Sequence, residues 1–443
     1  MSFASTLVQG KGVGSDVGVA LLGHGTVGKQ VLRFIGDNGD DLAHRIGGRI
    51  VVKGVAVGNP DKHKDDVPAE LLTTDAEALI ERDDVDIVVE VIGGIDYPRK
   101  LILKALNAGK SVVTANKALV AAHSQELAEA ADKAGVDLYF EAAVAAAIPV
   151  VGPLRRSLAG DQVEQVMGIV NGTTNFILDA MDTTGADYDT MLKKAMELGY
   201  AEADPTADVE GHDAASKAAI LASLAFHTRV SFDDVYCEGI SKVTADDVEA
   251  AKQAGYTIKL LACCERITAP DGTEKVSARV HPTLVPRSHP LASVSKSFNA
   301  VFVEAEAAGR LMFYGNGAGG APTASAVLGD LVGAARNKVH GGRAPGESTY
   351  ANLPIADFGE ISTRYHVDME VHDRVGVLAE VSKVFSDKGV SLRTVRQEES
   401  DDSARLIVVT HTAREADLAA TVEALKNLEA VTAVNSVLRL EGE

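Results

Sequence analysis

The chain has 443 residues, which is too long for one hydrophobic core and indicates two or three domains. Hydrophobic residues make up 46% and charged residues 24%, the balance of an ordinary globular protein rather than a disordered one. The formal net charge of -20 repels phosphate backbones, so nucleic acid is not expected as a partner.

The N-terminal third of the chain alternates strand and helix patterns. Residues 1–16 are rich in Gly and Ser and are expected to form a flexible N-terminus. Strands are predicted at 17–22, 49–57, 86–92, 111–114 and 137–144, and helices at 97–108 and 118–134. This α/β alternation indicates a parallel sheet covered on both faces, so residues 17–150 are expected to form a doubly wound nucleotide-binding domain.

The middle of the chain has a different pattern. An Ala-rich helix at 214–226 alternates with β-rich segments at 277–284 and 300–306, which indicates an α+β domain over 151–321 for substrate binding and dimerisation. A helix is predicted at 322–336, and residues 322–340 are expected to pack back on the first domain. Gly, Pro and Ser then gather, so 341–361 is expected to be a linker.

The last 82 residues, 362–443, form a separate pattern. Strands are predicted at 365–371, 391–397, 404–410 and 431–438, and helices at 375–388 and 416–428. This βαββαβ order predicts a ferredoxin-like domain.

A glycine-rich turn follows the first strand. Gly23-His24-Gly25-Thr26-Val27-Gly28 matches GxGxxG, which is weak evidence alone but strong between an apolar strand and a helix. The glycines allow a tight turn, close approach of a pyrophosphate and contact between helix and strand, while the helix N-terminus attracts the phosphates. The motif therefore predicts a dinucleotide site; a plain turn with chance glycines is the alternative.

The end of the second strand bears on which dinucleotide binds. Ala56-Val57-Gly58-Asn59 lacks the carboxylate that binds a ribose 2′-hydroxyl in NAD enzymes. Lys62 and Lys64 follow and are suited to a 2′-phosphate. We therefore expect NADP(H) to be preferred over NAD(H), although a solvated basic loop remains an alternative.

Lys217 is the only Lys or Arg between Lys194 and Arg229, and apolar residues flank it. Five carboxylates precede it, and Asp213 lies four residues earlier on the same helix face. A buried lysine is costly unless it is paired or functional. The functional interpretation is a proton donor and acceptor in hydride chemistry; an ordinary helix salt bridge is the alternative.

Other reactive side chains form no recognisable motif. The three cysteines, Cys237, Cys263 and Cys264, match neither a disulfide framework nor a zinc site, and free thiols favour a cytoplasmic location. The twelve histidines include no pair at zinc-binding spacing, and no serine lies in a nucleophile elbow. The longest apolar stretch, 138–154, is broken by a glutamate and two prolines, so no membrane partner is expected.

Several motifs in order resemble those of homoserine dehydrogenases. They are Ala195-x-x-x-Gly199-Tyr200-Ala201, Asp204-Pro205-x-x-Asp208, Gly211-x-Asp213, Lys217, Thr114-Ala115-Asn116-Lys117, Asn171-Gly172-Thr173-Thr174-Asn175 and Gly317-Ala318-Gly319. The resemblance covers about residues 17–336. It implies NAD(P)-dependent interconversion of L-homoserine and L-aspartate semialdehyde, in threonine and methionine biosynthesis.

The resemblance also assigns roles to individual residues. It implies that Lys217 is the catalytic proton donor and acceptor and that Lys117 is a second essential cation near nicotinamide and substrate. The implied substrate-binding residues are Glu202 and Asp213, for the homoserine amino and hydroxyl ends, with Gly172 and Thr173 lining the site. The expected coenzyme-binding residues are Gly23, Gly25, Thr26, Val27, Gly28, Lys62, Gly93, Lys117 and Gly319.

A sodium ion is also implied, because several members of the family hold one with a Glu side chain and backbone carbonyls. The matching positions are Glu141, Val144, Ala146 and Ile148. This chain departs from the family at 145–147, where three alanines stand and at least one glycine is usual. An Ala146→Gly substitution that raises turnover would show that the methyl group obstructs the site.

The C-terminal domain resembles an ACT domain, a module that pairs side by side and binds amino acids. Asp373-Arg374-Val375-Gly376-Val377 follows its first strand and opens its first helix, where exposed N–H groups suit an amino-acid carboxylate. The expected effector residues are Asp373, Gly376 and Val377, and the expected effector is L-threonine as feedback inhibitor. A dimerisation domain without ligand is the alternative.

We therefore expect a homodimeric or homotetrameric enzyme with a small-molecule substrate. One alternative is a different amino-acid or semialdehyde dehydrogenase built on the same nucleotide domain. Another is a catalytically weak or inactive amino-acid sensor, which only the triple alanine supports.

Overall fold

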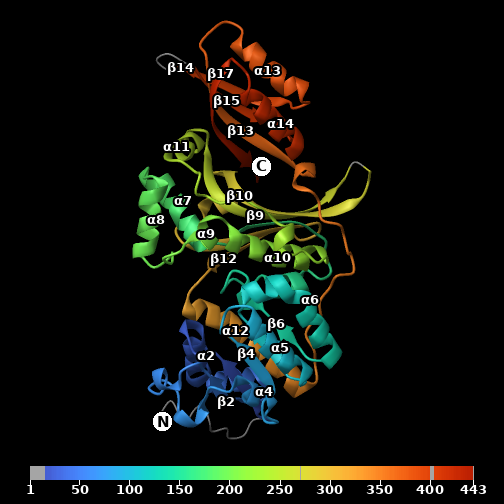
Figure 1. Cartoon of the computed structure of the whole chain (residues 1–443). Coiled ribbons are helices and arrows are strands. Elements are labelled where there is room, and N and C mark those ends of the chain that lie inside the picture. Colours follow the sequence, from blue (N-terminus) through green and yellow to red (C-terminus); the bar gives the residue numbers. More distant parts are fainter. Residues whose placement is uncertain (1–14, 270, 400–403, 443) are drawn as a thin grey trace. The chain divides into compact units, whose positions relative to one another are not determined.

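The computed structural model of the chain describes residues 15–269, 271–399 and 404–442 (Figure 1). Residues 1–14, most of the expected flexible N-terminus, lie outside this set. The described residues divide into two compact units. The first comprises 15–163, 219–232 and 299–352, and the second 164–218, 233–298 and 353–442.

The first unit is built on a parallel sheet in the order β3-β2-β1-β4-β5-β6. Its strands are β1 (Val17–Leu22), β2 (Ile50–Ala56), β3 (Leu72–Thr73), β4 (Ile87–Glu90), β5 (Ser111–Thr114) and β6 (Leu138–Tyr139). The apolar runs of β1 and β4 are buried along their whole length, as expected for strands covered on both faces.

Helices cover both faces of this sheet (Figure 1). They are α2 (Thr26–Asp37), α3 (Gly39–Ile46), α4 (Ala76–Glu81), α5 (Asp96–Asn107), α6 (Lys117–Ala134) and α12 (Gly320–His340). One core contains Val31 of α2 with Val327 of α12, and the other contains Leu101 of α5 with Leu127 of α6. Helix α12 thus packs on α2, although about 280 residues separate them along the chain.

The sequence prediction of a strand at 137–144 is wrong in its second half. β6 ends at Tyr139, and a 3₁₀ turn follows at Glu141–Ala143. The Glu141 carboxylate accepts N–H bonds from Val150, Val151 and Gly152 at 2.7–2.8 Å, which requires the chain to fold back at this point. Strands β11 (Phe298–Ala305) and β12 (Gly309–Asn316) are hydrogen-bonded to each other and do not belong to the parallel sheet of β1 to β6.

The second unit contains a sheet in the order β7-β9-β10-β17-β13-β15-β14, with β8 beside β10 and β16 beside β13. Its strands are β7 (Val163–Ile169), β8 (Tyr236–Cys237), β9 (Tyr256–Thr268), β10 (Glu274–Pro286), β13 (Ser362–Val371), β14 (Leu392–Glu399), β15 (Ala404–Thr410), β16 (Ala413–Arg414) and β17 (Val431–Leu440). Its helices are α7 (Gly172–Thr184), α8 (Tyr188–Glu197), α9 (Thr206–Val209), α11 (Ala245–Gln253), α13 (Val377–Asp387) and α14 (Glu415–Lys426). Helix α10 (His212–Phe226) begins in this unit and ends in the first.

The C-terminal βαββαβ segment continues this sheet rather than forming a separate one. β17 pairs antiparallel with β13 and, at its end, parallel with β10 through Thr283 opposite Arg439 and Leu284 opposite Leu440. The α/β fold class with a doubly wound first domain and a terminal βαββαβ domain is therefore confirmed.

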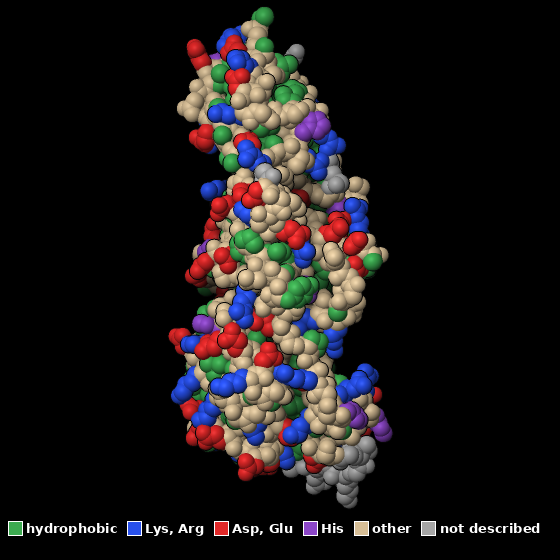
Figure 2. All heavy atoms as spheres, turned by 90° about the vertical axis from the view of Figure 1, so that its right-hand side faces the viewer, with side chains coloured by type: hydrophobic (Ala, Val, Ile, Leu, Met, Phe, Trp, Pro, Cys, Tyr) green, Lys and Arg blue, Asp and Glu red, His purple; other side chains and the backbone are tan. Residues whose placement is uncertain are grey.

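Acidic and basic side chains are interspersed on the face seen in Figure 2. Among the described residues, no helix combines the length and hydrophobicity needed to cross a bilayer.

Candidate functional site

The glycine-rich turn has the geometry that its sequence predicts. Gly23 has φ +101°, and a Cβ there would lie 2.8 Å from the Val91 carbonyl oxygen. A Cβ on Gly28 would lie 2.3 Å from the Gly23 oxygen. Gly25 is the N-cap of α2, which begins at Thr26, so both are exposed at the helix N-terminus. The turn therefore presents backbone N–H groups suited to a pyrophosphate.

The ends of β4 and β5 lie next to this turn in the sheet. Buried Glu90 accepts hydrogen bonds from the Ile92 N–H at 2.7 Å and from the Thr114 hydroxyl at 2.6 Å. Gly93 follows with φ +84° and is exposed. The sheet order changes direction between β1 and β4, and a nucleotide binds at such a point in doubly wound folds.

Lys117 is the first residue of α6, directly after β5. The Asn116 side chain caps this helix by accepting the Leu119 N–H at 3.2 Å, and it donates to the Gly94 carbonyl at 2.7 Å. Lys117 itself is exposed. The cap thus ties the start of α6 to the loop after β4, which contains Gly93.

The start of α12 also meets the glycine-rich turn. Gly319, its N-cap, has φ +117°, and a Cβ on Gly320 would lie 2.8 Å from the Thr26 carbonyl oxygen. The structure therefore brings Gly319 close to Thr26, as the coenzyme-site prediction requires.

A histidine pair ties the glycine-rich turn to the loop after β2. The Nδ1 atoms of His24 and His63 lie 3.1 Å apart, with the rings edge to face. Burial and then His63 lower the pKa of His24. Lys62, the neighbour of His63, is exposed, and Lys64 pairs with Asp61. Sequence reasoning missed this pair, because it joins residues 39 positions apart.

The predicted substrate residues gather around the start of α10, in the second unit. The Lys217 ammonium donates to Asp213 Oδ2 at 2.7 Å and to the Val170 carbonyl at 2.6 Å. Lys217 is 7% exposed and Asp213 is 8% exposed. The helix thus buries the ion pair that the four-residue spacing predicted, and the carbonyl orients the ammonium.

Asn171 and Asp208 complete this cluster. The Asn171 amide donates to Asp213 Oδ2 at 2.9 Å and to Asp208 Oδ1 at 2.6 Å, while its carbonyl oxygen accepts the Thr174 N–H and caps α7. Sequence reasoning quoted both residues within motifs but gave neither a role. Two features of the sequence could have identified them. Asn171 stands directly before a helix, where an N-cap is expected, and Asp208 is a carboxylate of a quoted motif to which no role was assigned.

The other predicted substrate residues lie on the same elements. Gly172 begins α7, and the Thr173 hydroxyl next to it donates to the Tyr200 carbonyl at 2.7 Å. This bond joins α7 to the segment that contains Glu202, whose side chain is exposed. The predicted coenzyme residues, with Lys117, thus belong to the first unit, and the predicted substrate residues belong to the second.

The predicted sodium residues follow β6. Both Glu141 oxygens accept backbone N–H groups from residues 150–152. Ala145 and Ala146 have φ +54° and +47°, in the left-handed region that favours glycine. Among the described residues, no group of three or more His, Cys, Asp or Glu side chains forms a metal site.

The predicted effector residues open α13. Gly376 is its N-cap with φ +95°, Val377 is buried and Asp373 is exposed. Val375 and Leu378 are exposed apolar side chains beside them. The helix start is therefore accessible.

Comparison with known proteins identifies three matching segments. The NAD-binding domain of homoserine dehydrogenase matches residues 23–141, homoserine dehydrogenase proper matches 149–332, and the ACT domain matches 365–430. Homoserine dehydrogenase from Corynebacterium glutamicum is 75% identical over 99% of this chain and 98% of its own.

Solved structures agree. A homoserine dehydrogenase from Thiobacillus denitrificans has a TM-score of 0.90 at 39% identity, covering 97% of this chain and 99% of its own. A hyperthermophilic archaeal homoserine dehydrogenase in complex with NADPH has a TM-score of 0.62 at 25% identity, covering 75% and 99%. With full-length relatives at this identity and all three domains matched in order, the chain belongs to the homoserine dehydrogenase family.

Proposed function

We propose that this chain interconverts L-homoserine and L-aspartate semialdehyde, with Lys217 as the catalytic proton donor and acceptor. The observation that supports this most is the buried Lys217–Asp213 pair at 2.7 Å, held by Asn171 and the Val170 carbonyl. When bound, the nicotinamide coenzyme accepts or supplies the hydride at the alcohol carbon.

The protein must then move one proton. In oxidation the substrate hydroxyl gives its proton to the Lys217 amine as the carbonyl forms; in reduction the ammonium returns it to the oxygen. Asp213 holds the lysine chain on one helix face and balances its charge. Glu202 and Asp213 bind the amino and hydroxyl ends of the substrate, with Gly172 and Thr173 beside them, and Lys117 acts as a second essential cation.

Substitution of Lys217 tests this role. Lys217→Ala should lower kcat by about a hundredfold or more, because a positioned proton donor contributes that much. Lys194→Ala is the control, since this exposed lysine of the same unit pairs with Glu197, three residues along its own helix. Near-parental turnover by folded Lys217→Ala would refute the assignment. Absence of turnover in the parent would instead favour the alternative of an inactive sensor.

We infer a preference for NADP(H) over NAD(H). The Asn59 side chain accepts the Asp61 N–H at 3.1 Å and so shapes the loop after β2 without supplying a carboxylate. The His24–His63 contact keeps Lys62 near the glycine-rich turn, and the archaeal relative was solved with NADPH. KM values for NADPH and NADH measure the preference, and a clear NADH advantage would reverse the inference.

We infer that the C-terminal domain binds an amino-acid effector at Asp373, Gly376 and Val377, with L-threonine as feedback inhibitor. Deletion from Tyr365 would remove β17 and expose β10, so a point substitution is the cleaner test. Gly376→Val places a β-branched residue at φ +95° and should abolish inhibition while leaving dehydrogenase activity. Unchanged threonine inhibition in this variant would place the effector elsewhere.

The remaining proposals are a homodimer or homotetramer, a cytoplasmic location and the domain boundaries given above. A sodium ion at Glu141 and the carbonyls of Val144, Ala146 and Ile148 also stays a prediction, since the carboxylate already accepts three N–H groups. Turnover in sodium and in choline buffers of equal ionic strength tests it. The proposed reaction uses no step at this ion.

A further inference from the structure

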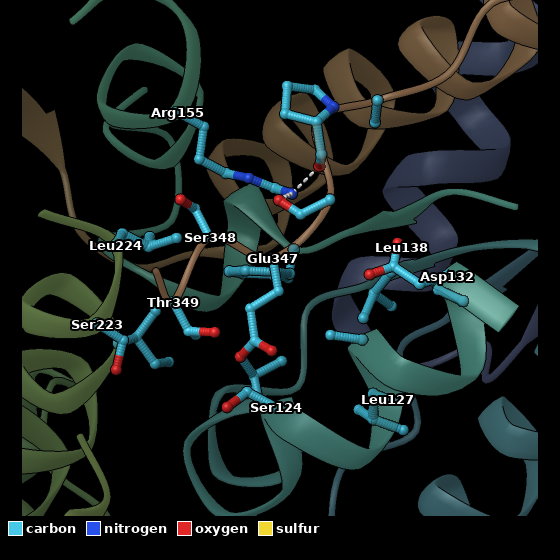
Figure 3. A pocket seen from close by; sticks show the side chains of 18 of the residues that line it. Ser124, Leu127, Asp132, Leu138, Arg155, Ser223, Leu224, Glu347, Ser348 and Thr349 are labelled. Atoms are coloured by element: carbon cyan, nitrogen blue, oxygen red, sulfur yellow. Dashed lines mark hydrogen bonds between the residues drawn. The ribbon is translucent and has the colours of Figure 1, made fainter. Parts of the chain in front are cut away.

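The first unit contains a cavity of about 320 Å³. It lies between α6, the C-terminal half of α10 and the segment 343–350, which we call the strap (Figure 3). Among the described residues, none that we assign to coenzyme or substrate lines it. Its volume is at the lower end of the range for small-molecule sites.

The strap is fixed across the cavity rather than loosely laid on it. The Arg155 guanidinium donates to the Gly346 carbonyl at 3.1 Å and also to the neighbouring Pro345 carbonyl (Figure 3). Glu347 of the strap pairs with Arg229 at 2.9 Å. Arg343 of the strap pairs with Asp132 at 2.7 Å, so Glu347 and Arg343 both have charged partners, whereas Arg155 bonds neutral carbonyls.

The lining specifies a chemical class of ligand. Its wall is apolar, from Leu127, Leu138, Leu154, Ile220 and Leu224. Hydroxyl groups line it on Ser124, Ser348 and Thr349, whereas the Ser223 hydroxyl is already bonded to the Ala219 carbonyl and the Val230 N–H. An apolar wall with a few hydroxyls suits a small, largely apolar molecule with one neutral hydrogen-bonding group. A charged ligand would have to displace the carbonyls that Arg155 bonds or break the Glu347–Arg229 pair.

Helix α10 connects this cavity to the substrate residues. Ile220 and Leu224 lie three and seven residues after Lys217, so all three lie on one helix face. A ligand in the cavity presses on this face two turns beyond the ammonium. Because a helix moves as a rigid element, a shift of its C-terminal half displaces Lys217.

We propose that the cavity is an effector site for a small, largely apolar molecule with one neutral hydrogen-bonding group, and that its occupancy alters turnover through α10. The effect on turnover rests on the proposed reaction, whereas binding of the ligand does not.

Binding can be measured with 2-naphthol, an apolar probe with one hydroxyl and a water-sensitive fluorescence. The chain contains no Trp, so the probe signal is not masked. We expect saturable binding to the full chain and at least about tenfold weaker binding to Ala128→Phe, which fills the cavity from α6. Ala122→Phe, at an exposed position of the same helix, is the matched control.

Each outcome decides one half of the proposal. Absence of saturable binding, or equal binding by the filled and control variants, refutes the site; Ser348→Phe, from the exposed strap, replaces Ala128→Phe if the latter does not fold. Saturating probe should change kcat in the parent and not in the filled variant. Binding without a change in kcat refutes the coupling alone, and lack of parental turnover refutes the proposed reaction.

A second observation, in the other unit, concerns Arg439 near the end of β17. Its guanidinium bonds Glu415 of α14 and Glu238 Oε2, the latter at 2.8 Å. It also lies 5.0–5.6 Å from the ring centres of Tyr236, Phe358 and Tyr365. The side chain is 12% exposed, so these contacts are largely desolvated.

Glu238 joins this cluster to the turn before α10. The Ile240 N–H donates to the Val209 carbonyl at 2.8 Å, and a Cβ on Gly239 would lie 2.3 Å from the same oxygen. The turn continues through Gly211, whose φ is +84°, and α10 then begins with Asp213 in its first turn. Residues 238–240 therefore support the backbone of residues 209–211, which leads into α10 and so positions Asp213.

We infer that Arg439 is a positioning residue, through which the C-terminal domain helps build the substrate site. Arg439→Gln and Glu238→Gln should each raise the homoserine KM by about fivefold to tenfold, while the coenzyme KM changes by less than about twofold. Arg439→Lys should recover part of the loss. Arg405→Gln is the matched control, because Arg405 pairs with Asp368 inside the same domain and does not bond Glu238.

This test is independent of threonine and of any effector. Unchanged homoserine KM in both folded Gln variants refutes the inference, as does an equal rise in the Arg405→Gln control. Glu238→Gln, with a partly exposed side chain, serves alone if Arg439→Gln does not fold. Failure of the parent to turn over homoserine refutes the proposed reaction, and homoserine binding by calorimetry then replaces KM as the readout.

Discussion

The strongest stability prediction concerns the left-handed alanines after β6. Ala146 has φ +47°, a conformation that costs a residue with a Cβ roughly 1–2 kcal/mol relative to glycine. Replacing it by glycine removes this cost but loses a buried methyl, worth about 0.8 kcal/mol, and adds unfolded-state entropy worth about 0.4–1 kcal/mol. Ala146→Gly should therefore change the free energy of unfolding by less than about 1 kcal/mol.

Ala143→Gly provides the matched control. Ala143 is also buried but lies in a 3₁₀ turn at negative φ, so its substitution loses the methyl and adds unfolded-state entropy without relieving strain. The two variants should differ by roughly 1–2 kcal/mol, with Ala146→Gly the more stable. Urea unfolding followed by circular dichroism measures the difference, since the chain lacks Trp. Equal stability of the two variants would show that Ala146 carries no strain.

Three further predictions concern buried or crowded groups. Burial raises the pKa of the Asp330 carboxyl from 3.8 to about 7. The free energy of unfolding is therefore highest below pH 3.8, where the carboxyl is protonated in both states, and it falls by at most roughly 4 kcal/mol as the pH rises through 7. Asp330→Asn should therefore raise the urea midpoint more at pH 8 than at pH 5; an equal effect at both would contradict this. His63→Ala removes the contact with His24 and should raise the NADPH KM by about tenfold with little change for NADH, as steady-state kinetics will show. Gly28→Ala places a Cβ 2.3 Å from the Gly23 oxygen and should lower both the melting temperature and the affinity for either coenzyme, measured by calorimetry.

Local patterns predicted the parts of this fold that local chemistry determines. The glycine-rich turn needs a positive φ at Gly23 and no Cβ at Gly28, and both requirements follow from the residues themselves. Parts that depend on distant partners were not predictable. β6 ends early because Glu141 bonds N–H groups nine to eleven residues later. The β10–β17 pairing joins strands about 150 residues apart.

The candidate site shows the same division at the level of single residues. A helix repeat places Asp213 beside Lys217, so this pair could be predicted from spacing alone. Asn171, by contrast, reaches Asp213 across 42 residues. Its amide and the Asp208 carboxylate come together only when α7, α9 and α10 have packed.

Burial alone does not distinguish Lys217, the proposed proton carrier, from another buried lysine. Lys259 on β9 is 1% exposed, more deeply buried than Lys217, and its ammonium donates to the Val294 carbonyl at 2.7 Å and Asn175 Oδ1 at 3.1 Å. Burial lowers the pKa of Lys259 to about 8. The cost of a buried cation therefore singles out both residues equally.

The two lysines differ in the partner that their secondary structure provides. Asp213 and Lys217 lie four residues apart on one helix, so the helix places their opposite charges side by side. Such a pair can be recognised from the spacing in the sequence. A strand points alternate residues to opposite faces, and the partners that the described part of the chain gives the Lys259 ammonium are neutral oxygens. The carboxylate at helical spacing therefore separates the two lysines in the folded chain, whereas in the sequence Lys217 stood out by its apolar flanks as well as by the carboxylates before it.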